Sequence, residues 1–173
     1  MVKIPFSRTR GKVDASYIRN FIFGVEDSLV STVGLLSGIA IAEVEQRTIL
    51  LAGVVLIFVE AFSMATGSYL SERGAEEYAT QRTAKIKGPL IDGLIMFVSY
   101  FVTGFIPLLP YLLFSVSVAF PVSIIVTLVA LFGLGALSGR FAKLNIFTNG
   151  LKALLVGGIA VLLGVGVGRL FAL

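Results

Sequence analysis

Long stretches without charged side chains dominate this sequence, and most polar positions fall between them or near their ends. Five stretches are each long and apolar enough to cross a bilayer, which takes roughly 20 residues: residues 18–42, 48–71, 91–113, 118–137 and 146–170. Continuous apolar runs of this length favour helices, because membrane strands alternate apolar and polar residues. The pattern predicts an all-α integral membrane protein with five transmembrane helices in one transmembrane domain, residues 1–173.

The boundary between the third and fourth spans carries the weakest signal, because the 47 residues from Gly93 to Gly139 contain no charge. This stretch is too long for one span and long enough for two. Pro107, Pro110 and Pro121 lie near its middle, and proline favours a turn by restricting the backbone. We therefore expect a turn at these prolines, between residues 113 and 118.

The composition supports a membrane protein and narrows its chemistry. Hydrophobic residues make up 57% of the chain and charged residues 14%, whereas a soluble domain is nearer half apolar and a quarter charged. The chain has no Cys and no His, which excludes a disulfide framework, thiolate and imidazole metal sites, and a histidine base. Carboxylates, hydroxyls, thioethers and backbone carbonyls remain to handle ions or protons.

The basic residues indicate an orientation. With a cytoplasmic N-terminus, 12 of the 14 Lys and Arg residues fall on the cytoplasmic side, leaving only Arg47 and Arg169 on the far side, as the positive-inside rule requires. We therefore expect the N-terminus inside and the C-terminus outside. The net charge of +4 then reflects topology and contact with anionic lipids, and nucleic-acid binding has no support.

Residues 1–14 are polar and basic and lack the apolar core of a signal peptide. They are expected either to lie on the membrane surface as a short helix or to be disordered. The short loops and the lack of a transit peptide favour a prokaryotic plasma membrane. An odd number of spans makes an internal inverted repeat awkward, so any twofold symmetry would come from a homodimer.

Four acidic residues fall inside or at the edge of predicted spans: Glu26, Asp27, Glu60 and Asp92. A charge at a helix centre costs roughly 2.5–3.5 kcal/mol, so such groups normally face a bundle interior or a water cavity. Asp92 follows Pro89 at the start of its helix, where capping is the favoured interpretation. The other three lie deeper, and we expect them to bind a cation or to exchange protons.

Helical spacing places small and polar residues beside these carboxylates. The stripe on the first predicted helix comprises Asp27, Ser31, Gly34 and Gly38, and the stripe on the second comprises Glu60, Ser63, Met64, Gly67 and Ser71. The Gly34–Gly38 GxxxG pattern favours close helix contact. Met64 is ordinarily core filler, but opposite Asp27 its thioether would suit Fe²⁺ or Mn²⁺ better than Ca²⁺ or Mg²⁺.

The largest polar segment is the predicted cytoplasmic loop over residues 72–88, which contains Glu72, Glu76 and Glu77 together with four basic residues. One interpretation is an ordinary solvated, salt-bridged helix end. The other is a vestibule that gathers divalent cations and passes them to Asp27. The sequence leaves both open.

Several motifs, in order along the chain, resemble the vacuolar iron transporter family, including its nodulin-like members. The run from Phe23 to Thr32 resembles that family's first-helix motif G-x-x-D-G-L-x-T-T, with Ser28 in place of the glycine after Asp27. Residues 60–71 contain the second-helix core S-M-x-x-G-x-Y-L, and residues 104–111 match the third-helix motif G-x-x-P-L-L-P-Y. The glycine-rich stretch of residues 150–169 is similar to the fifth helix.

This resemblance implies a five-helix homodimer that moves Fe²⁺, and often Mn²⁺, out of the cytoplasm in exchange for protons, with no resident cofactor. Asp27 and Met64 would line the path at the dimer interface, and Pro107 and Pro110 would shape a cavity. Plant and yeast members carry a long cytoplasmic domain with Glu clusters between the second and third helices. The corresponding region here spans only about 17 residues, of which the three Glu residues would be the remnant.

The main hypothesis is therefore an Fe²⁺/Mn²⁺ exporter. Metal would be collected at Glu72, Glu76 and Glu77 and bound by Asp27 and Met64; Glu26 and Glu60 would couple protons, with Ser31 and Ser63 lining the path. A passive cation channel at the same dimer axis is the alternative. An intramembrane enzyme is disfavoured, because no nucleophile–base pair is present. A purely structural membrane protein would leave the carboxylates within the spans unexplained.

Overall fold

The computed structural model describes residues 10–172, and within this range the chain is an all-helical bundle. Its helices are α1 (Arg10–Ile41), α2 (Gln46–Thr80), α3 (Lys87–Leu113), α4 (Val116–Phe141) and α5 (Ile146–Phe171). All five of these helices are long and apolar enough to cross a membrane. The predicted all-α class is confirmed, as is the expectation of five helices with the length and apolar composition of membrane spans.

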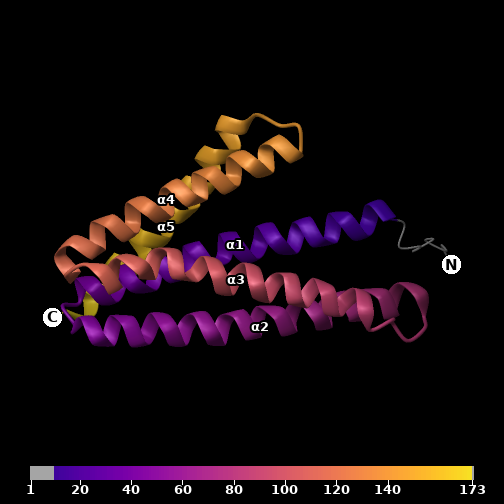
Figure 1. The fold of residues 1–173 in the computed structure, drawn as a ribbon, viewed down its shortest axis with the longest axis horizontal. Coiled ribbons are helices and arrows are strands. Elements are labelled where there is room, and N and C mark those ends of the chain that lie inside the picture. Colours follow the sequence, from indigo (N-terminus) through magenta and orange to yellow (C-terminus); the bar gives the residue numbers. More distant parts are fainter. Residues whose placement is uncertain (1–9, 173) are drawn as a thin grey trace.

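The helices run back and forth along the long axis of the molecule (Figure 1). The start of α1 and the α2–α3 connection lie at one end, while the α1–α2 connection, the α3–α4 connection and the C-terminus lie at the other. Helix α3 packs against both α1 and α2, and α5 packs against both α1 and α4. The α4–α5 hairpin leans away from the other helices toward its connecting turn (Figure 1).

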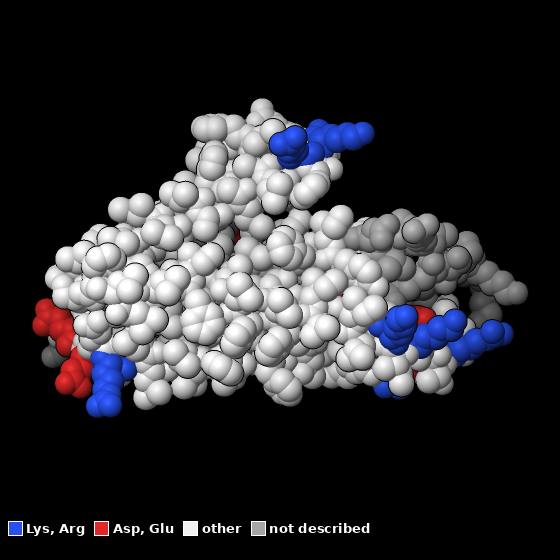
Figure 2. All heavy atoms as spheres, in the orientation of Figure 1, with Lys and Arg blue, Asp and Glu red and all other residues white. Residues whose placement is uncertain are grey.

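Charged side chains lie at the extremities of the bundle, and an uncharged band separates them (Figure 2). On the visible face, basic side chains gather beside the α2–α3 connection and near the α4–α5 turn, and a few acidic and basic ones mark the opposite end. Large apolar side chains such as Leu51, Phe58 and Phe62 point outward from α2 and are mostly exposed. This surface suits contact with lipid chains rather than water.

Helix α2 is longer than its predicted span and shortens the predicted loop over residues 72–88. Its 35 residues extend about 52 Å at 1.5 Å per residue, whereas the hydrocarbon core of a bilayer is about 30 Å thick. The polar residues from Glu72 to Thr80 continue the helix, partly because the Arg73 Nε donates to Glu77 Oε1 one turn later, at 3.1 Å. Only residues 81–86 connect α2 to α3.

The polar N-terminal segment partly joins the first helix. Residues 10–14 form the first part of α1, which continues without interruption into the membrane span. Residues 1–9, on which the expectation of a surface helix or disorder also falls, lie outside the described residues.

The turn between α3 and α4 occurs at Phe114 and Ser115, inside the expected interval, but the prolines do not form it. Pro107 and Pro110 lie within α3, and Pro121 lies within α4. The carbonyl of Pro107 accepts a hydrogen bond from the Ser123 Oγ of α4 at 2.6 Å. Proline is tolerated inside membrane helices, and this hydrogen bond from Ser123 joins α4 to the proline-containing part of α3.

Close backbone contact between α1 and α5 depends on glycine. Gly34 and Gly38 of α1 face Gly164 and Gly168 of α5. A Cβ added at Gly34 would lie 3.3 Å from the carbonyl oxygen of Ala160, and one added at Gly164 would overlap the carbonyl oxygen of Gly34. The GxxxG pattern of α1 is therefore satisfied inside the chain, by α5, because only glycine allows the two backbones to approach this closely.

We predict that Gly164→Ala destabilises the bundle by about 1–3 kcal/mol, the usual cost of overpacking a close contact. The added methyl group meets the backbone of α1, which cannot move aside as a flexible side chain can. Thermal unfolding in detergent, followed by circular dichroism, measures the effect. Gly166→Ala is the matched control on the same helix, since a Cβ there meets nothing within 4 Å. Equal stability of the two variants would contradict the contact.

Candidate functional site

A cavity of about 1070 Å³ lies between α1 and α2, and α3 contributes one residue to its lining. The side chains and glycine that line it are Arg19, Asn20, Ile22, Phe23 and Glu26 of α1, Ser63, Met64, Gly67, Ser68, Ser71, Glu72 and Ala75 of α2, and Met96 of α3. The α2 members recur at three- and four-residue steps and so share one helical face. The cavity brings together five of the predicted site residues: Glu26, Ser63, Met64, Gly67 and Glu72.

Gly67 lines this cavity and does not lie at a contact between helices. A Cβ added at Gly67 would meet nothing within 4 Å, so within the chain this glycine does not serve the close packing that its stripe predicted. Its missing side chain instead leaves room between Met64 and Glu72 on the same face of α2. Pro107 and Pro110 are fully buried elsewhere in α3 and are not among the cavity-lining residues.

Asp27 and Glu60 lie beside the cavity lining, not among it. Both side chains are half-buried, and the carboxyl group of Asp27 is close enough to those of Glu60 and Glu26 for electrostatic interaction. Like charges at such separations repel unless a proton or a cation is shared between them. The folded chain therefore gathers three of the predicted carboxylates at mid-length of α1 and α2.

Tyr100 of α3 belongs to this carboxylate group, although the sequence pattern did not reveal it. Its side chain is fully buried, its Oη lies 2.6 Å from the Ser31 Oγ, and it interacts electrostatically with both Asp27 and Glu60. A buried tyrosine hydroxyl normally needs a polar partner. This requirement was the available signal for Tyr100, but it does not reveal which helix supplies the partner.

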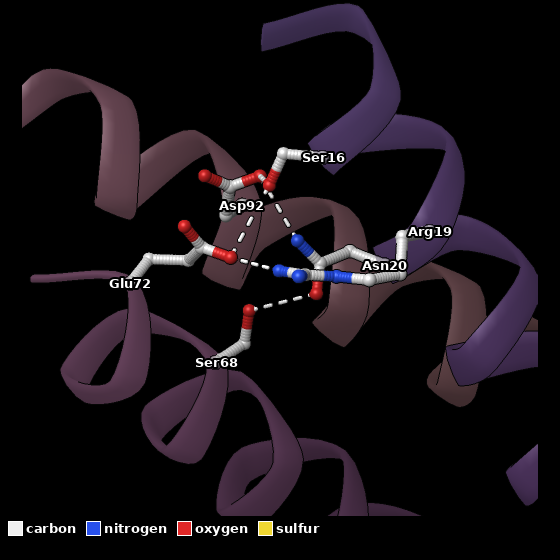
Figure 3. A network of polar contacts seen from close by, with 6 residues as sticks. All are labelled: Ser16, Arg19, Asn20, Ser68, Glu72 and Asp92. Atoms are coloured by element: carbon white, nitrogen blue, oxygen red, sulfur yellow. Dashed lines mark hydrogen bonds and ion pairs between the residues drawn. The ribbon is translucent and has the colours of Figure 1, made fainter. Parts of the chain in front are cut away.

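A network of polar side chains joins α1, α2 and α3 at one end of the cavity (Figure 3). Asp92 of α3 accepts hydrogen bonds from the Ser16 Oγ and the Asn20 Nδ2 of α1, each at 2.9 Å. The Asn20 Oδ1 in turn accepts from the Ser68 Oγ of α2 at 3.0 Å. These hydrogen bonds join the three helices to one another near the charged end of the bundle that holds the α2–α3 connection.

The predicted capping role of Asp92 is wrong. Helix α3 begins at Lys87, with Ile86 at the cap position and no side-chain cap hydrogen bond. Asp92 thus lies in the second turn, fully buried, because the helix starts earlier than the position of Pro89 suggested. Its carboxylate contacts α1 instead of its own helix N-terminus.

The three Glu residues at the end of α2 do not converge on one point. Glu72 forms an ion pair with Arg19 of α1 and accepts from the Ser16 Oγ at 3.3 Å. Glu77, beyond the apolar part of α2, accepts from Arg73 and from the backbone N–H of Ala84, and these donors lower the pKa of its carboxyl group. Among the described residues, no three acidic side chains group as metal ligands. Glu76 lies on the same helical face as Glu72.

Comparison with known proteins places the chain in a family. Its sequence matches the profile of the VIT family over residues 18–87 and 75–169. The chain belongs to the VIT family. The two matched parts overlap at the α2–α3 connection, where the resemblance implies an inserted domain in longer members. This VIT-family chain is therefore an integral membrane protein.

Two relatives align with most of this VIT-family chain. "Vacuolar iron transporter homolog 2" of Oryza sativa subsp. japonica is 27% identical over 176 aligned positions, covering 91% of this chain and 92% of the rice protein. The uncharacterized protein MJ0645 of Methanocaldococcus jannaschii is 26% identical over 161 positions, covering 83% of each chain. The similarity extends through all of the described helices rather than one segment.

We predict that Asp92→Ala destabilises the bundle by about 1–3 kcal/mol, because it deprives the buried amide of Asn20 and the half-buried hydroxyl of Ser16 of their acceptor. Asp92→Asn, which keeps one acceptor oxygen, should cost less. Chemical unfolding in detergent measures both. Asn20→Ala should resemble Asp92→Ala, since the two residues share a bond between helices. If Asn20→Ala left the free energy of unfolding unchanged while Asp92→Ala lowered it, the hydrogen bond between these residues would not explain the loss of stability.

Proposed function

We propose that this VIT-family chain transports divalent transition metals, Fe²⁺ and Mn²⁺, out of the cytoplasm in exchange for protons. The carrying observation is the cavity between α1 and α2, whose lining contains both the Met64 thioether and the Glu26 carboxylate. Family membership and the name of the rice relative, vacuolar iron transporter homolog 2, support a metal as the cargo.

The available donors favour this class of metal. Carboxylate and hydroxyl oxygens suit Mn²⁺ and Fe²⁺, and a thioether shifts the preference away from Ca²⁺ and Mg²⁺. The chain has neither Cys nor His, which are the usual ligands of Zn²⁺. A divalent metal, rather than an organic solute, fits a cavity whose lining holds two carboxylates and two thioethers, those of Met64 and Met96.

We propose that the working unit is a homodimer with α1 and α2 of each copy facing the twofold axis. The close-packing glycines of α1 are already occupied by α5, so the α1–α2 face that carries Asp27 and Met64 remains for a second copy. Each protomer would supply one carboxylate and one thioether from these residues. Two copies would supply four donors, and water would complete the coordination shell.

Exchange with protons follows from the chemistry of the carboxylates. A carboxyl group must be deprotonated to bind a metal, so metal binding releases protons and protons promote metal release. Glu26, Asp27 and Glu60 form one electrostatic group, so a proton taken up by Glu26 or Glu60 weakens metal binding at Asp27. In the predicted orientation, with the α2–α3 connection in the cytoplasm, protons that enter from the far side would drive metal out of the cytoplasm.

We predict that Asp27→Ala reduces Mn²⁺ uptake into proteoliposomes by at least about 10-fold, the loss that follows even when a supporting residue of a metal site is removed. Glu45→Ala is the matched control, because this exposed carboxylate lies outside the spans and its side chain makes no cap hydrogen bond. Size-exclusion chromatography checks that both variants keep the wild-type assembly. Full uptake by Asp27→Ala would reject the site.

We further predict that a pH gradient drives Mn²⁺ uphill. A gradient of one pH unit supplies about 1.36 kcal/mol per proton, enough for about tenfold accumulation per exchanged proton with the membrane potential clamped. A fluorescent metal indicator inside the vesicles measures accumulation, and an ionophore that collapses the gradient should abolish it. A passive channel only equilibrates the metal, so absence of uphill movement in an active preparation would favour the channel.

A further inference from the structure

An ion pair spans one end of the cavity. Arg19 of α1 and Glu72 of α2 both line the cavity, and the Arg19 guanidinium donates to the Glu72 carboxylate (Figure 3). Among the described residues that line the cavity, Arg19 is the only basic one. Its side chain is 64% exposed, whereas that of Glu72 is 19% exposed. A largely exposed guanidinium is thus held on a partly buried carboxylate at the end of the cavity.

The pair lies outward of the donors proposed to bind metal. Arg19 precedes Glu26 by seven residues on α1, which corresponds to about 10 Å along a helix. Met64 precedes Glu72 by eight residues on the antiparallel α2, or about 12 Å. A cation that enters from the α2–α3 end of the bundle therefore meets the pair before it reaches Glu26 or Met64.

The hydrogen bonds among Asn20, Ser68 and Asp92 hold the helices in place, so the Arg19 side chain can move while the helices stay fixed. Asn20 and Asp92 are both buried and joined by a 2.9 Å hydrogen bond, and the Ser68 Oγ of α2 donates to Asn20. These contacts hold α1, α2 and α3 together at the level of the ion pair. An exposed side chain can change rotamer within nanoseconds, so Arg19 can leave Glu72 while the helices stay in place.

We propose that Arg19 is a tethered competitor for the transported metal: its guanidinium occupies the Glu72 carboxylate and closes the outer end of the cavity until a divalent cation displaces it. A divalent cation attracts the carboxylate with twice the charge of the guanidinium. Na⁺ or K⁺ carries no such advantage and lacks the hydrogen bonds of arginine. Arg19 thereby selects divalent over monovalent cations. This inference rests on the proposed metal transport and assigns its entry step.

The first test compares Mn²⁺ uptake by Arg19→Gln and wild-type proteoliposomes. Removing the competitor should lower the apparent KM for Mn²⁺ by about two- to five-fold, the range expected for a partly exposed ion pair, and should make uptake sensitive to K⁺ at concentrations that leave the wild type unaffected. Arg73→Gln is the matched control, because Arg73 pairs with Glu77 and does not line the cavity. An unchanged or raised KM in Arg19→Gln would overturn the proposal.

The second test does not depend on transport. The chain contains no cysteine, so Ser63→Cys places a single thiol on the inner part of the cavity lining. In membrane vesicles, a small cationic thiol reagent should modify this cysteine faster when Arg19→Gln is added and no faster when Arg73→Gln is added. Mn²⁺ should accelerate modification only when Arg19 is present. Equal rates in all three backgrounds would reject the closure.

The two tests separate this inference from the proposed function. If the wild type moves no divalent metal but thiol modification still depends on Arg19, metal transport fails and the closure stands. If the wild type transports Mn²⁺ while neither the KM nor the modification rate responds to Arg19, transport stands and the closure fails. Thermal unfolding of Arg19→Gln shows whether the variant keeps the fold in which these rates are compared.

Discussion

The free-energy cost of removing a charged group from water governs how this bundle is arranged. Apolar side chains such as Phe62 lie on the outer surface, and charged groups lie at the two ends of the bundle and near the α4–α5 turn. The carboxylates that remain between the extremities, Glu26, Asp27 and Glu60, gather at one level of α1 and α2 beside a cavity and a buried tyrosine. Because the same cost makes such groups receptive to a cation, the constraint on folding also creates the chemistry of the site.

Helix α1 connects packing to function. On one side its glycines bring its backbone against α5, with Gly34 and Gly164 in direct contact. On another side Asn20 reaches the buried Asp92 of α3. These two contacts fix the rotation of α1 about its axis. Backbones in direct contact cannot shift without a clash, and breaking a buried hydrogen bond costs folding free energy. The rotation in turn sets which acidic residues of α1 line the cavity.

Sequence reasoning succeeded where one helix alone carries the signal. Apolar run length located the membrane helices, and helical spacing placed Ser63, Met64 and Gly67 on one face of α2. It failed where the answer depends on a neighbouring helix. Asp92 was interpreted as a cap because its position relative to Pro89 was visible, whereas its partner Asn20 lies 72 residues away.

The amino-acid sequence by itself determined the all-helical membrane class, the approximate helix bounds and the donor types available to a cation, because each depends on local composition and periodicity. The tertiary structure alone decided that Glu26 rather than Asp27 lines the cavity, that Tyr100 joins the carboxylate group, and that Arg19 forms an ion pair with Glu72. Those outcomes depend on the rotation and spacing of packed helices, which arise from contacts between residues far apart in the chain and leave no periodic trace along it.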